Sequence, residues 1–288
     1  VERLPELKLD IKDTRLGKTD FYYKGDIQIS NLAKKFADKN QPDMEAFRID
    51  TFNKGSYVTK FFNFLNVIPY VATRQTYYSR NLFNEKYLIR GVFQGGVDSN
   101  FKLSRVYDVK TNFLGMDINR LRHIITPSVS SNYIHPPTIA AENLQQFDDI
   151  DAITRGNTLG ISLENKLQTK RKVITDGKLG VDAGRQSIDL ARFIVSTDYS
   201  FKPKNGSGSQ FGDFIGNLEL RPYNWLFLKL DADYSHAIPQ GEQKIAAFKT
   251  VDFDMTATHG DLWAVSLEHR YERKASSILS ALIPYKFS

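Results

Sequence analysis

The residues of this chain that are best suited to chemistry are carboxylates spaced two positions apart. Asp231 and Asp233 form one such pair, and Asp252 and Asp254 form another. Residues two apart on a β-strand share a face, so each pair could serve general acid–base catalysis. The same spacing is what a strand with one water-facing side requires, and we favour that interpretation. We therefore assign no catalytic residue and do not expect an enzyme.

Other sequence signatures of chemistry are absent. The chain contains no G-x-G-x-x-G, Walker or G-x-S-x-G pattern. Its histidines form no H-x-x-x-H or H-E-x-x-H pair, and it has no cysteine for a thiolate metal site or a disulfide. No strand interleaves basic and aromatic residues on one face, as binding of single-stranded nucleic acid requires. We therefore expect no cofactor, no metal ion and no nucleic-acid partner.

The dominant pattern of the sequence is an alternation of apolar and polar residues with a period of two. In residues 225–236 and 262–274, one face is apolar and the other is charged. Because successive side chains of a strand point to opposite faces, the pattern predicts a ribbon with one apolar side and one wet side. A long chain of such ribbons is typical of a barrel with lipid outside and water inside. The residues that we expect to face the water-filled lumen are Asp98, Lys102, Glu164, Lys166, Lys229, Asp231, Asp233, Asp252, Asp254, Glu268 and Arg270.

The predicted fold is all-β, an antiparallel transmembrane outer-membrane β-barrel. We expect about 13 strands, which is a partial barrel within a larger one, and we treat residues 1–288 as a single domain. One segment, 88–109, is longer than most strands of globular sheets, and this length suits a strand that projects beyond a membrane. The expected strands are 4–12, 20–32, 47–61, 65–79, 88–109, 121–135, 158–167, 191–201, 211–220, 225–236, 248–258, 262–273 and 278–287.

The expected connections are of two kinds, which is the outer-membrane pattern of short turns on one rim and long loops on the other. The short turns are 221–224 and 259–261, and the long loops are 33–45, 136–156, 168–190, 202–210 and 237–244. Aromatic residues near strand ends are expected at the level of the lipid head groups. They are Tyr22, Tyr23, Tyr77, Tyr78, Tyr133, Tyr223, Trp225, Tyr234, Trp263, Tyr271 and Tyr285.

The bulk composition is compatible with this interpretation. Mean hydropathy is −0.39, and no apolar run reaches the length of about 18 residues that a transmembrane helix needs. The net charge of +6 would suit nucleic acid in a soluble protein, or anionic head groups at a membrane. The densest basic cluster includes Lys166, Lys170, Arg171 and Lys172. We interpret it as a solvated turn, with phosphate contact by Lys170, Arg171 and Lys172 as the functional alternative.

A series of motifs in the first half of the chain resembles the LPS-assembly outer-membrane protein family, LptD or OstA. The resemblance rests on the order and spacing of the motifs, and the second half of the chain shares only the strand pattern. The motifs are Arg3-Leu4-Pro5-Glu6-Leu7, Arg48-Ile49-Asp50, Ile68-Pro69-Tyr70 followed by Arg74, Thr76 and Tyr78, Gly91-Val92-Phe93-Gln94 leading to Lys102-Leu103-Ser104-Arg105, and Leu121-Arg122-His123-Ile124-Ile125-Thr126-Pro127-Ser128-Val129 followed by Tyr133.

The resemblance implies transport rather than covalent chemistry. Members of the family form a large barrel behind an N-terminal periplasmic jelly-roll domain, and they insert lipopolysaccharide into the outer leaflet through a seam between the first and last strands. The implied partners are lipopolysaccharide, an LptE-like outer-membrane lipoprotein that plugs the lumen, and a periplasmic lipopolysaccharide-bridge protein. The implied location is the outer membrane of a Gram-negative-type bacterium. The chain departs from the family in lacking a recognisable jelly roll and in having too few strands for the whole barrel, so we assign no seam residue.

Two other functions remain open at this point. A passive porin or substrate-specific outer-membrane channel would show an inward constriction loop and rings of charge. A soluble β-rich binding protein, such as a carbohydrate-binding sandwich, would bury the apolar faces of its sheets inward.

Overall fold

The computed structural model describes residues 1–37, 43–172, 174–175, 178–179, 185–201, 210–240, 243–259 and 263–284. The regular structure of these residues is strand, apart from two short 3-10 turns, Phe113–Gly115 and Ala141–Asn143. The prediction of an all-β, antiparallel fold is confirmed. Across the parts of the chain that are described, no helix is long and apolar enough to cross a membrane.

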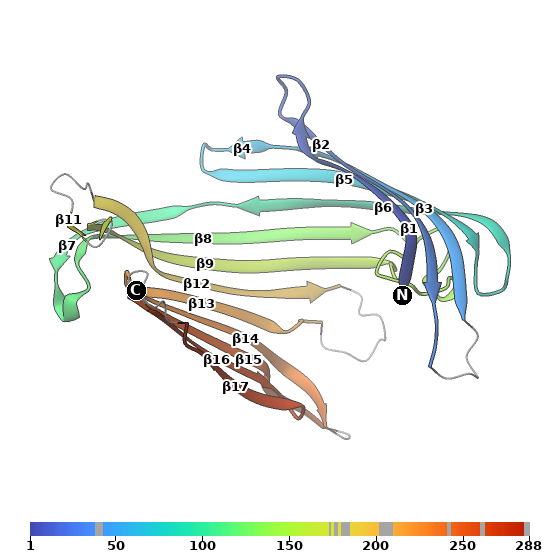
Figure 1. Cartoon of the computed structure of the whole chain (residues 1–288). Coiled ribbons are helices and arrows are strands. Elements are labelled where there is room, and N and C mark those ends of the chain that lie inside the picture. The colour runs from blue at the N-terminus through green and yellow to red at the C-terminus, as the bar shows by residue number, and fades with distance from the viewer. Residues whose placement is uncertain are drawn as a thin grey trace. The chain divides into compact units, whose positions relative to one another are not determined.

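The strands follow one another along the sheet almost in sequence order (Figure 1). Hydrogen bonds join them in the order β1-β2-β3-β5-β6-β8-β9-β12-β13-β14-β15-β16-β17, with β4 beside β5, β7 beside β8, and β10–β11 as a separate hairpin. Their bounds are β1 Glu2–Arg15, β2 Phe21–Lys34, β3 Met44–Tyr57, β4 Thr59–Phe61, β5 Leu65–Arg80, β6 Lys86–Asn100, β7 Leu103–Thr111, β8 Ile118–Ile134, β9 Gly156–Lys172, β10 Ile174–Thr175, β11 Lys178–Leu179, β12 Arg185–Ser200, β13 Phe214–Tyr223, β14 Leu226–Gln240, β15 Gln243–His259, β16 Trp263–Glu272 and β17 Ser276–Leu282.

Every segment that the sequence marks as a strand contains one, but several ends differ. The loops expected at 168–190 and 237–244 are shorter, because β9 continues to Lys172 and β14 and β15 continue to Gln240 and Gln243. The extension of β9, residues 168–172, is polar throughout, whereas residues 237–240 and 243–247 mix apolar and polar residues irregularly. Neither pattern alternates with a period of two, while the backbone ladder, which needs no particular side chain, continues. The expected turn at 259–261 and loop at 202–210 fall largely outside the described residues.

The long strand expected at 88–109 is two strands, β6 and β7, separated at Phe101 and Lys102. The amide of Phe101 donates to the carbonyl of Pro127 on β8 at 3.4 Å. Proline has no N–H to return the second bond of the pair, so the ladder is interrupted opposite Pro127. Pairing resumes at Leu103 and Ile125.

The chain divides into two compact units. Unit 1 contains the described residues of 1–99, 130–159 and 200–201, and unit 2 contains those of 100–129, 160–199 and from 210 onward.

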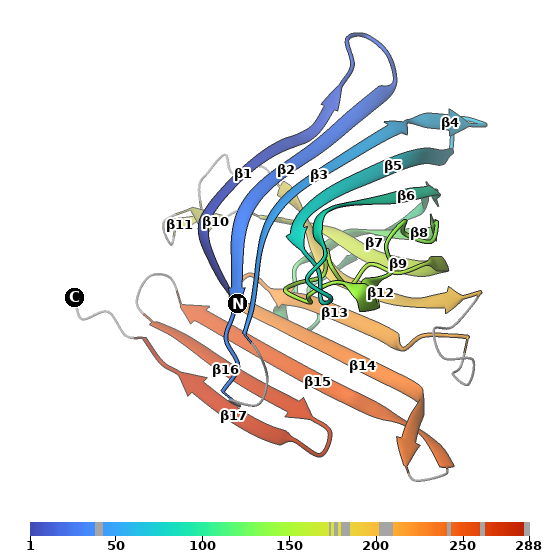
Figure 2. The ribbon, with the colours of Figure 1, turned by 90° about the vertical axis from the view of Figure 1, so that its right-hand side faces the viewer.

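In unit 1, strands β1, β2, β3 and β5 lie side by side (Figure 2) and their register sorts the side chains into rows. Directly paired residues share a face, and the next row along the strands takes the other face. One row is apolar: Leu7, Ile29, Ile49 and Tyr77. The neighbouring row is polar: Lys8, Gln28, Asp50 and Thr76.

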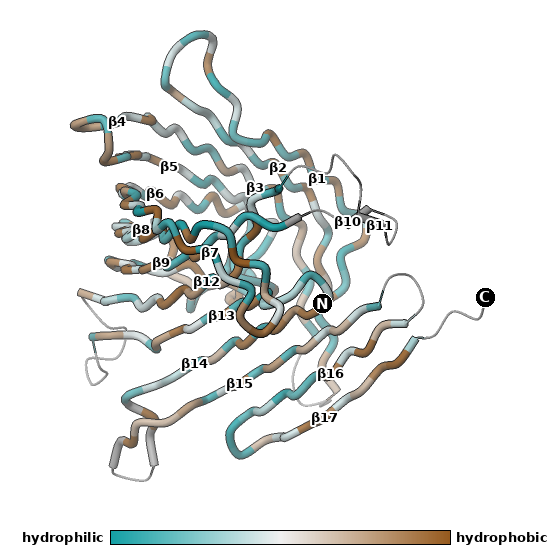
Figure 3. The backbone as a smooth tube through the Cα atoms, turned by 90° about the vertical axis from the view of Figure 1, so that its left-hand side faces the viewer, coloured by the Kyte–Doolittle hydropathy of each residue, from teal (hydrophilic) through white to brown (hydrophobic). Residues whose placement is uncertain are grey.

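Unit 2 repeats this arrangement in β12 to β17, and along the strands hydrophilic and hydrophobic positions alternate (Figure 3). One row consists of Phe193, Leu218, Leu230, Phe253, His269 and Leu279. The adjacent row on the other face consists of Arg192, Glu219, Lys229, Asp254, Glu268 and Ser280.

We predict that Gly96→Ala destabilises unit 1. A Cβ at Gly96 would lie 2.1 Å from the carbonyl oxygen of Ser131 on β8 and 2.6 Å from the hydroxyl of Tyr70 on β5. Relief of this overlap requires the backbones to separate, at a cost of about 1–3 kcal/mol. Urea unfolding in detergent micelles measures the decrease in the free energy of unfolding.

Gly55→Ala is the matched control, because a Cβ at Gly55 has no heavy atom within 4 Å. Equal effects of the two substitutions would show that the close approach at Gly96 does not limit stability.

Candidate functional site

The segment of residues 135–155, which we name the docked segment, packs onto the polar face of unit 1. It joins β8 to β9 and was expected to be a long polar loop. Phe147 packs against Leu32 of β2 and Ala46 of β3, and all three side chains are buried. The ammonium group of Lys34 donates to the carbonyl of Gln146 at 3.2 Å. The segment is therefore part of the folded unit.

The guanidinium group of Arg48 on β3 is the main contact to the docked segment. It is fully buried and donates to both carboxylate oxygens of Asp148, at 2.8 and 2.7 Å, and to Asp151 at 3.0 Å. Arg3 of β1 also donates to Asp148, at 2.9 Å. The buried Arg48 and the exposed Arg3 thus meet two carboxylates, so the charges of the cluster balance, which a partly buried cluster needs in order to be tolerated.

Asp151 is fully buried and each of its carboxylate oxygens accepts hydrogen bonds. One oxygen accepts from Arg48 and from the hydroxyl of Tyr78 at 2.7 Å. The other accepts from the amides of Phe147 and Asp148, at 2.9 and 3.2 Å. Tyr78 was expected among the head-group aromatics, and this is wrong, because its ring is buried on the polar face with its hydroxyl on Asp151.

Arg90 of β6 holds the backbone of the docked segment. Its buried guanidinium donates to the carbonyls of Ile139 at 2.9 Å, Ile150 at 2.8 Å and Asp151 at 3.3 Å, and also to Ile153. An arginine presents several N–H donors in a fixed planar fork, so one side chain can satisfy carbonyls at both ends of the segment.

Asp148 shows the electrostatic character of this network. Burial raises the pKa of its carboxyl group, but the hydrogen bonds and positive charge of Arg48 outweigh burial and hold the pKa below its ordinary value. Asp148 is therefore charged at neutral pH, and the contact between the strands and the docked segment is an ion pair rather than a neutral hydrogen bond.

The structure brings most of the predicted lumen-facing residues together on the charged face of unit 2. Cross-strand pairs join Lys229 to Asp254, Asp231 to Asp252, Asp252 to Arg270 and Asp254 to Glu268. Arg270 contacts Asp254 at 2.6 Å and Glu268 at 3.7 Å. Asp233 lies two residues from Asp231 on the same strand. We name these residues, together with Glu164, Lys166, Asp189, Arg192 and Glu219, the charged face.

On β9, Glu164 and Lys166 continue the charged face toward β12. Arg192 donates to Glu164 at 2.6 Å and lies 3.7 Å from Glu219. Lys166 lies 3.6 Å from Asp189. The remaining two predicted residues are elsewhere: Asp98 is on β6 in unit 1, and Lys102 is exposed at the break between β6 and β7.

The residues predicted to contact phosphate do not form one patch. Lys170 is exposed, whereas Arg171 is buried and donates to the carbonyls of Met116 at 2.9 Å, Arg221 at 3.0 Å and Pro222 at 2.5 Å. Arg171 is thus occupied by backbone acceptors. The side chain of Lys172 lies outside the described residues.

The role of the docked segment is not evident from the sequence. Asp148 and Asp151 lie in a segment whose prolines and polar residues predict a loop, and no local spacing connects them to Arg48 or Arg90. One signal was present: the run from Phe147 to Asp151 combines apolar and acidic residues, which a fully solvated loop does not need.

Within each of these two regions, the side chains are joined by ion pairs and hydrogen bonds. No group of three or more potential metal ligands occurs among the residues that the structure describes. The sequence matches no family model and no curated protein. The candidate functional regions are two polar surfaces. They are the polar face of unit 1 with its docked segment, and the charged face of unit 2.

We predict that Asp151→Asn loosens the docked segment. The substitution leaves Arg48 buried with one carboxylate fewer, and removal of one partner from a buried ion pair costs about 3 kcal/mol or more. Limited proteolysis within residues 135–155, together with thermal unfolding in detergent, measures the change.

Asp149→Asn is the matched control, because Asp149 is exposed in the same segment. Equal cleavage rates for the two variants would contradict a specific role for Asp151.

Proposed function

We propose that this chain forms part of the wall of an outer-membrane β-barrel that delivers lipopolysaccharide to the outer leaflet. The main support for a barrel is that unit 1 buries charged side chains and exposes apolar ones. Arg48, Asp50 and Arg90 are 0% exposed, whereas large aliphatic side chains on the opposite face are among the most exposed in the chain. A soluble protein buries the second group and exposes the first.

The exposed apolar side chains of unit 1 form a band rather than isolated residues. Leu7 and Leu9 of β1 pair with Ile29 and Ile27 of β2. Leu7 is 66% exposed and Leu9 is 57% exposed. Soluble monomers seldom expose a continuous apolar patch of this kind, whereas the lipid-facing side of a barrel requires one.

The two end strands of the sheet, β1 and β17, bear on how a barrel would close. Within the described residues, β1 pairs with β2 and β17 pairs with β16, and each has no second partner. Open sheet edges do not occur in the hydrocarbon region, because unpaired backbone groups are too costly there. A membrane-inserted form therefore needs both edges paired, either with each other or with further strands.

The lipopolysaccharide cargo is supported by the resemblance to the LPS-assembly family and by the nature of the faces. Several motif residues of that resemblance, including Arg48, Asp50, Thr76 and Tyr78, lie on the polar face of unit 1 and take part in its hydrogen bonds. A polar lumen suits sugars and phosphates, and no covalent chemistry is needed. The lipoprotein plug and the periplasmic bridge protein are partners that this function would require.

A passive porin or substrate-specific channel is the second candidate, and the docked segment favours it. A segment that packs onto the inward polar face corresponds to the constriction loop that a channel of this kind uses. The two candidates share the barrel and differ in what passes through it.

We predict that labelling along β14 follows the strand period. The chain has no cysteine, so single cysteines at positions 228–233 can each carry an environment-sensitive fluorophore. In bilayers with brominated acyl chains, we expect quenching at Leu228, Leu230 and Ala232 and no quenching at Lys229, Asp231 and Asp233, because only the first set faces lipid. Quenching without a period of two would contradict the barrel.

We predict that depletion of the protein lowers the amount of lipopolysaccharide at the cell surface. A transport component is required for delivery, so newly made lipopolysaccharide should accumulate inside and escape modification by external enzymes. Surface labelling after depletion measures this effect. Unchanged surface lipopolysaccharide, together with solute flux through liposomes that contain the protein, would instead assign it to the channel class.

A further inference from the structure

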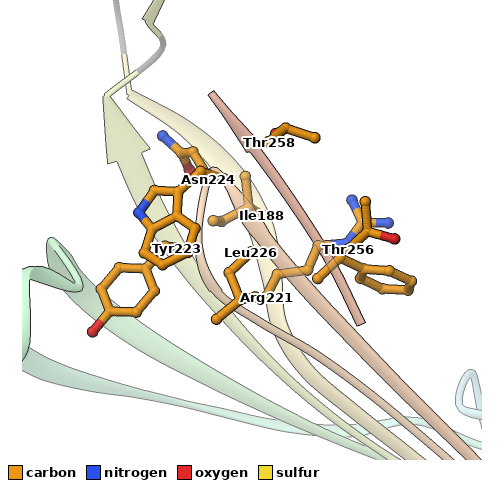
Figure 4. A pocket seen from close by; sticks show the side chains of 9 residues that line it. Ile188, Arg221, Tyr223, Asn224, Leu226, Thr256 and Thr258 are labelled. Atoms are coloured by element: carbon orange, nitrogen blue, oxygen red, sulfur yellow. The ribbon is translucent and has the colours of Figure 1, made fainter. Parts of the chain in front are cut away.

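The turn between β13 and β14 forms an aromatic pocket that the proposed function does not yet use (Figure 4). Tyr223 and Trp225 stack with their ring centroids 5.0 Å apart and their planes inclined by 9°. Arg221 lies over the ring of Phe227, 4.9 Å from its centroid. The pocket has a volume of about 340 Å³ and its opposite wall carries Thr256 and Thr258.

This pocket opens on the charged face of unit 2. Phe227 pairs with Thr256, two residues along from the pair of Lys229 and Asp254, so both pairs share one face of the sheet. A polar cleft of about 330 Å³ adjoins it, shares Arg221 as a lining residue, and contains Arg192 and Glu219. Across the register shift after Leu220, Tyr223 pairs with Leu226, a residue of the apolar face, and its ring stacks on that of Trp225.

The aromatic turn is held firmly in place. Arg171, which is buried, donates to the backbone carbonyls of Arg221 and Pro222. The hydroxyl of Tyr223 donates to the carbonyl of Leu114 at 2.8 Å. Binding surfaces gain affinity when their contact groups are already ordered. The stacked rings therefore present a preformed flat surface. Trp225 is 49% exposed, so its ring is accessible to a ligand.

Arg221 differs from the other basic residues nearby. Arg192 and Lys166 are each engaged with carboxylates. Among the described residues, no carboxylate forms an ion pair with Arg221, and no hydrogen bond from its guanidinium occurs. Its side chain lines both the aromatic pocket and the polar cleft with Arg192 and Glu219, so its N–H groups are available to an acidic group of a ligand.

We propose that this pocket binds a sugar ring that carries an acidic group. The flat aromatic surface of Trp225 takes the apolar face of the ring, Arg221 takes the acidic group, and the hydroxyls of Thr256 and Thr258 and the amide of Asn224 supply hydrogen bonds to sugar hydroxyls. The site deepens the proposed function, because lipopolysaccharide is one source of such a group and a free sugar phosphate is another.

The intrinsic fluorescence of Trp225 provides the test. The chain has only two tryptophans, so Trp263→Phe leaves Trp225 as the single reporter. The folded chain in detergent micelles is titrated separately with glucose 6-phosphate, glucose and inorganic phosphate. We expect a saturable change with glucose 6-phosphate and weaker binding of the other two, because each of them lacks one of the two contacts.

Arg221→Gln should weaken binding of glucose 6-phosphate by about tenfold or more, since it removes a charge-assisted hydrogen bond. Arg120→Gln is the matched control, because Arg120 is an exposed arginine of the same unit outside the pocket. Titration calorimetry measures how much an aromatic ring at position 225 contributes to binding of glucose 6-phosphate. Trp225→Phe should retain binding and Trp225→Ala should lose it. Circular dichroism checks that both variants keep their strand content.

No saturable response to glucose 6-phosphate, or an equal loss in the Arg221 and Arg120 variants, would overturn the site. Competition by purified lipopolysaccharide distinguishes the two sources of the acidic sugar, which are lipopolysaccharide and a free sugar phosphate. Displacement of glucose 6-phosphate supports the site with the export cargo as its ligand. Binding of glucose 6-phosphate without such displacement supports the site with a free sugar phosphate as its ligand, and the surface-delivery experiment tests the export function separately.

Discussion

The antiparallel register of the strands is the constraint on which the other features depend. Side chains alternate between two faces, so a slip of one residue would move every charge of a strand to its apolar side. The pairs Leu230 with Phe253 and Lys229 with Asp254 are neighbours in the same ladder and lie on opposite faces. Once this register is set along β12 to β17, the alternating charged residues of neighbouring strands lie together on one face and form the charged face.

The docked segment depends on the same register in unit 1. Arg48 of β3 pairs with Tyr78 of β5, and this pairing places the guanidinium and the phenol side by side where both reach Asp151. Buried ions are stable only when their charges and hydrogen bonds are matched. The segment is therefore held by the specific arrangement of four charged groups, Arg3, Arg48, Asp148 and Asp151, rather than by apolar contact alone. Phe147 adds a small apolar anchor to this network.

The period of two was sufficient to predict strands β12 to β17 and the charged residues on one face of them, because both depend on local alternation. It could not predict the partners of Arg48, since Asp151 lies 103 residues away in a segment without periodicity. It also could not separate Arg171 from the exposed Lys170, because burial of Arg171 depends on carbonyls of two distant turns. Interruption of the long strand opposite Pro127 required knowledge of the register, which the sequence of one strand does not contain.

The charge distribution of unit 2 explains why Arg221 alone can determine where an acidic sugar binds. Carboxylates outnumber basic side chains on the charged face, and Arg192, Lys229 and Arg270 each lie against at least one of them. Each basic side chain is offset by a carboxylate and the carboxylates in excess leave the face net negative, so an anionic glycan is not attracted along these rows. At the β13–β14 turn, by contrast, Arg221 lies against an aromatic ring rather than a carboxylate. An acidic sugar can therefore move across the charged face without adhering to it and still be held at this one position.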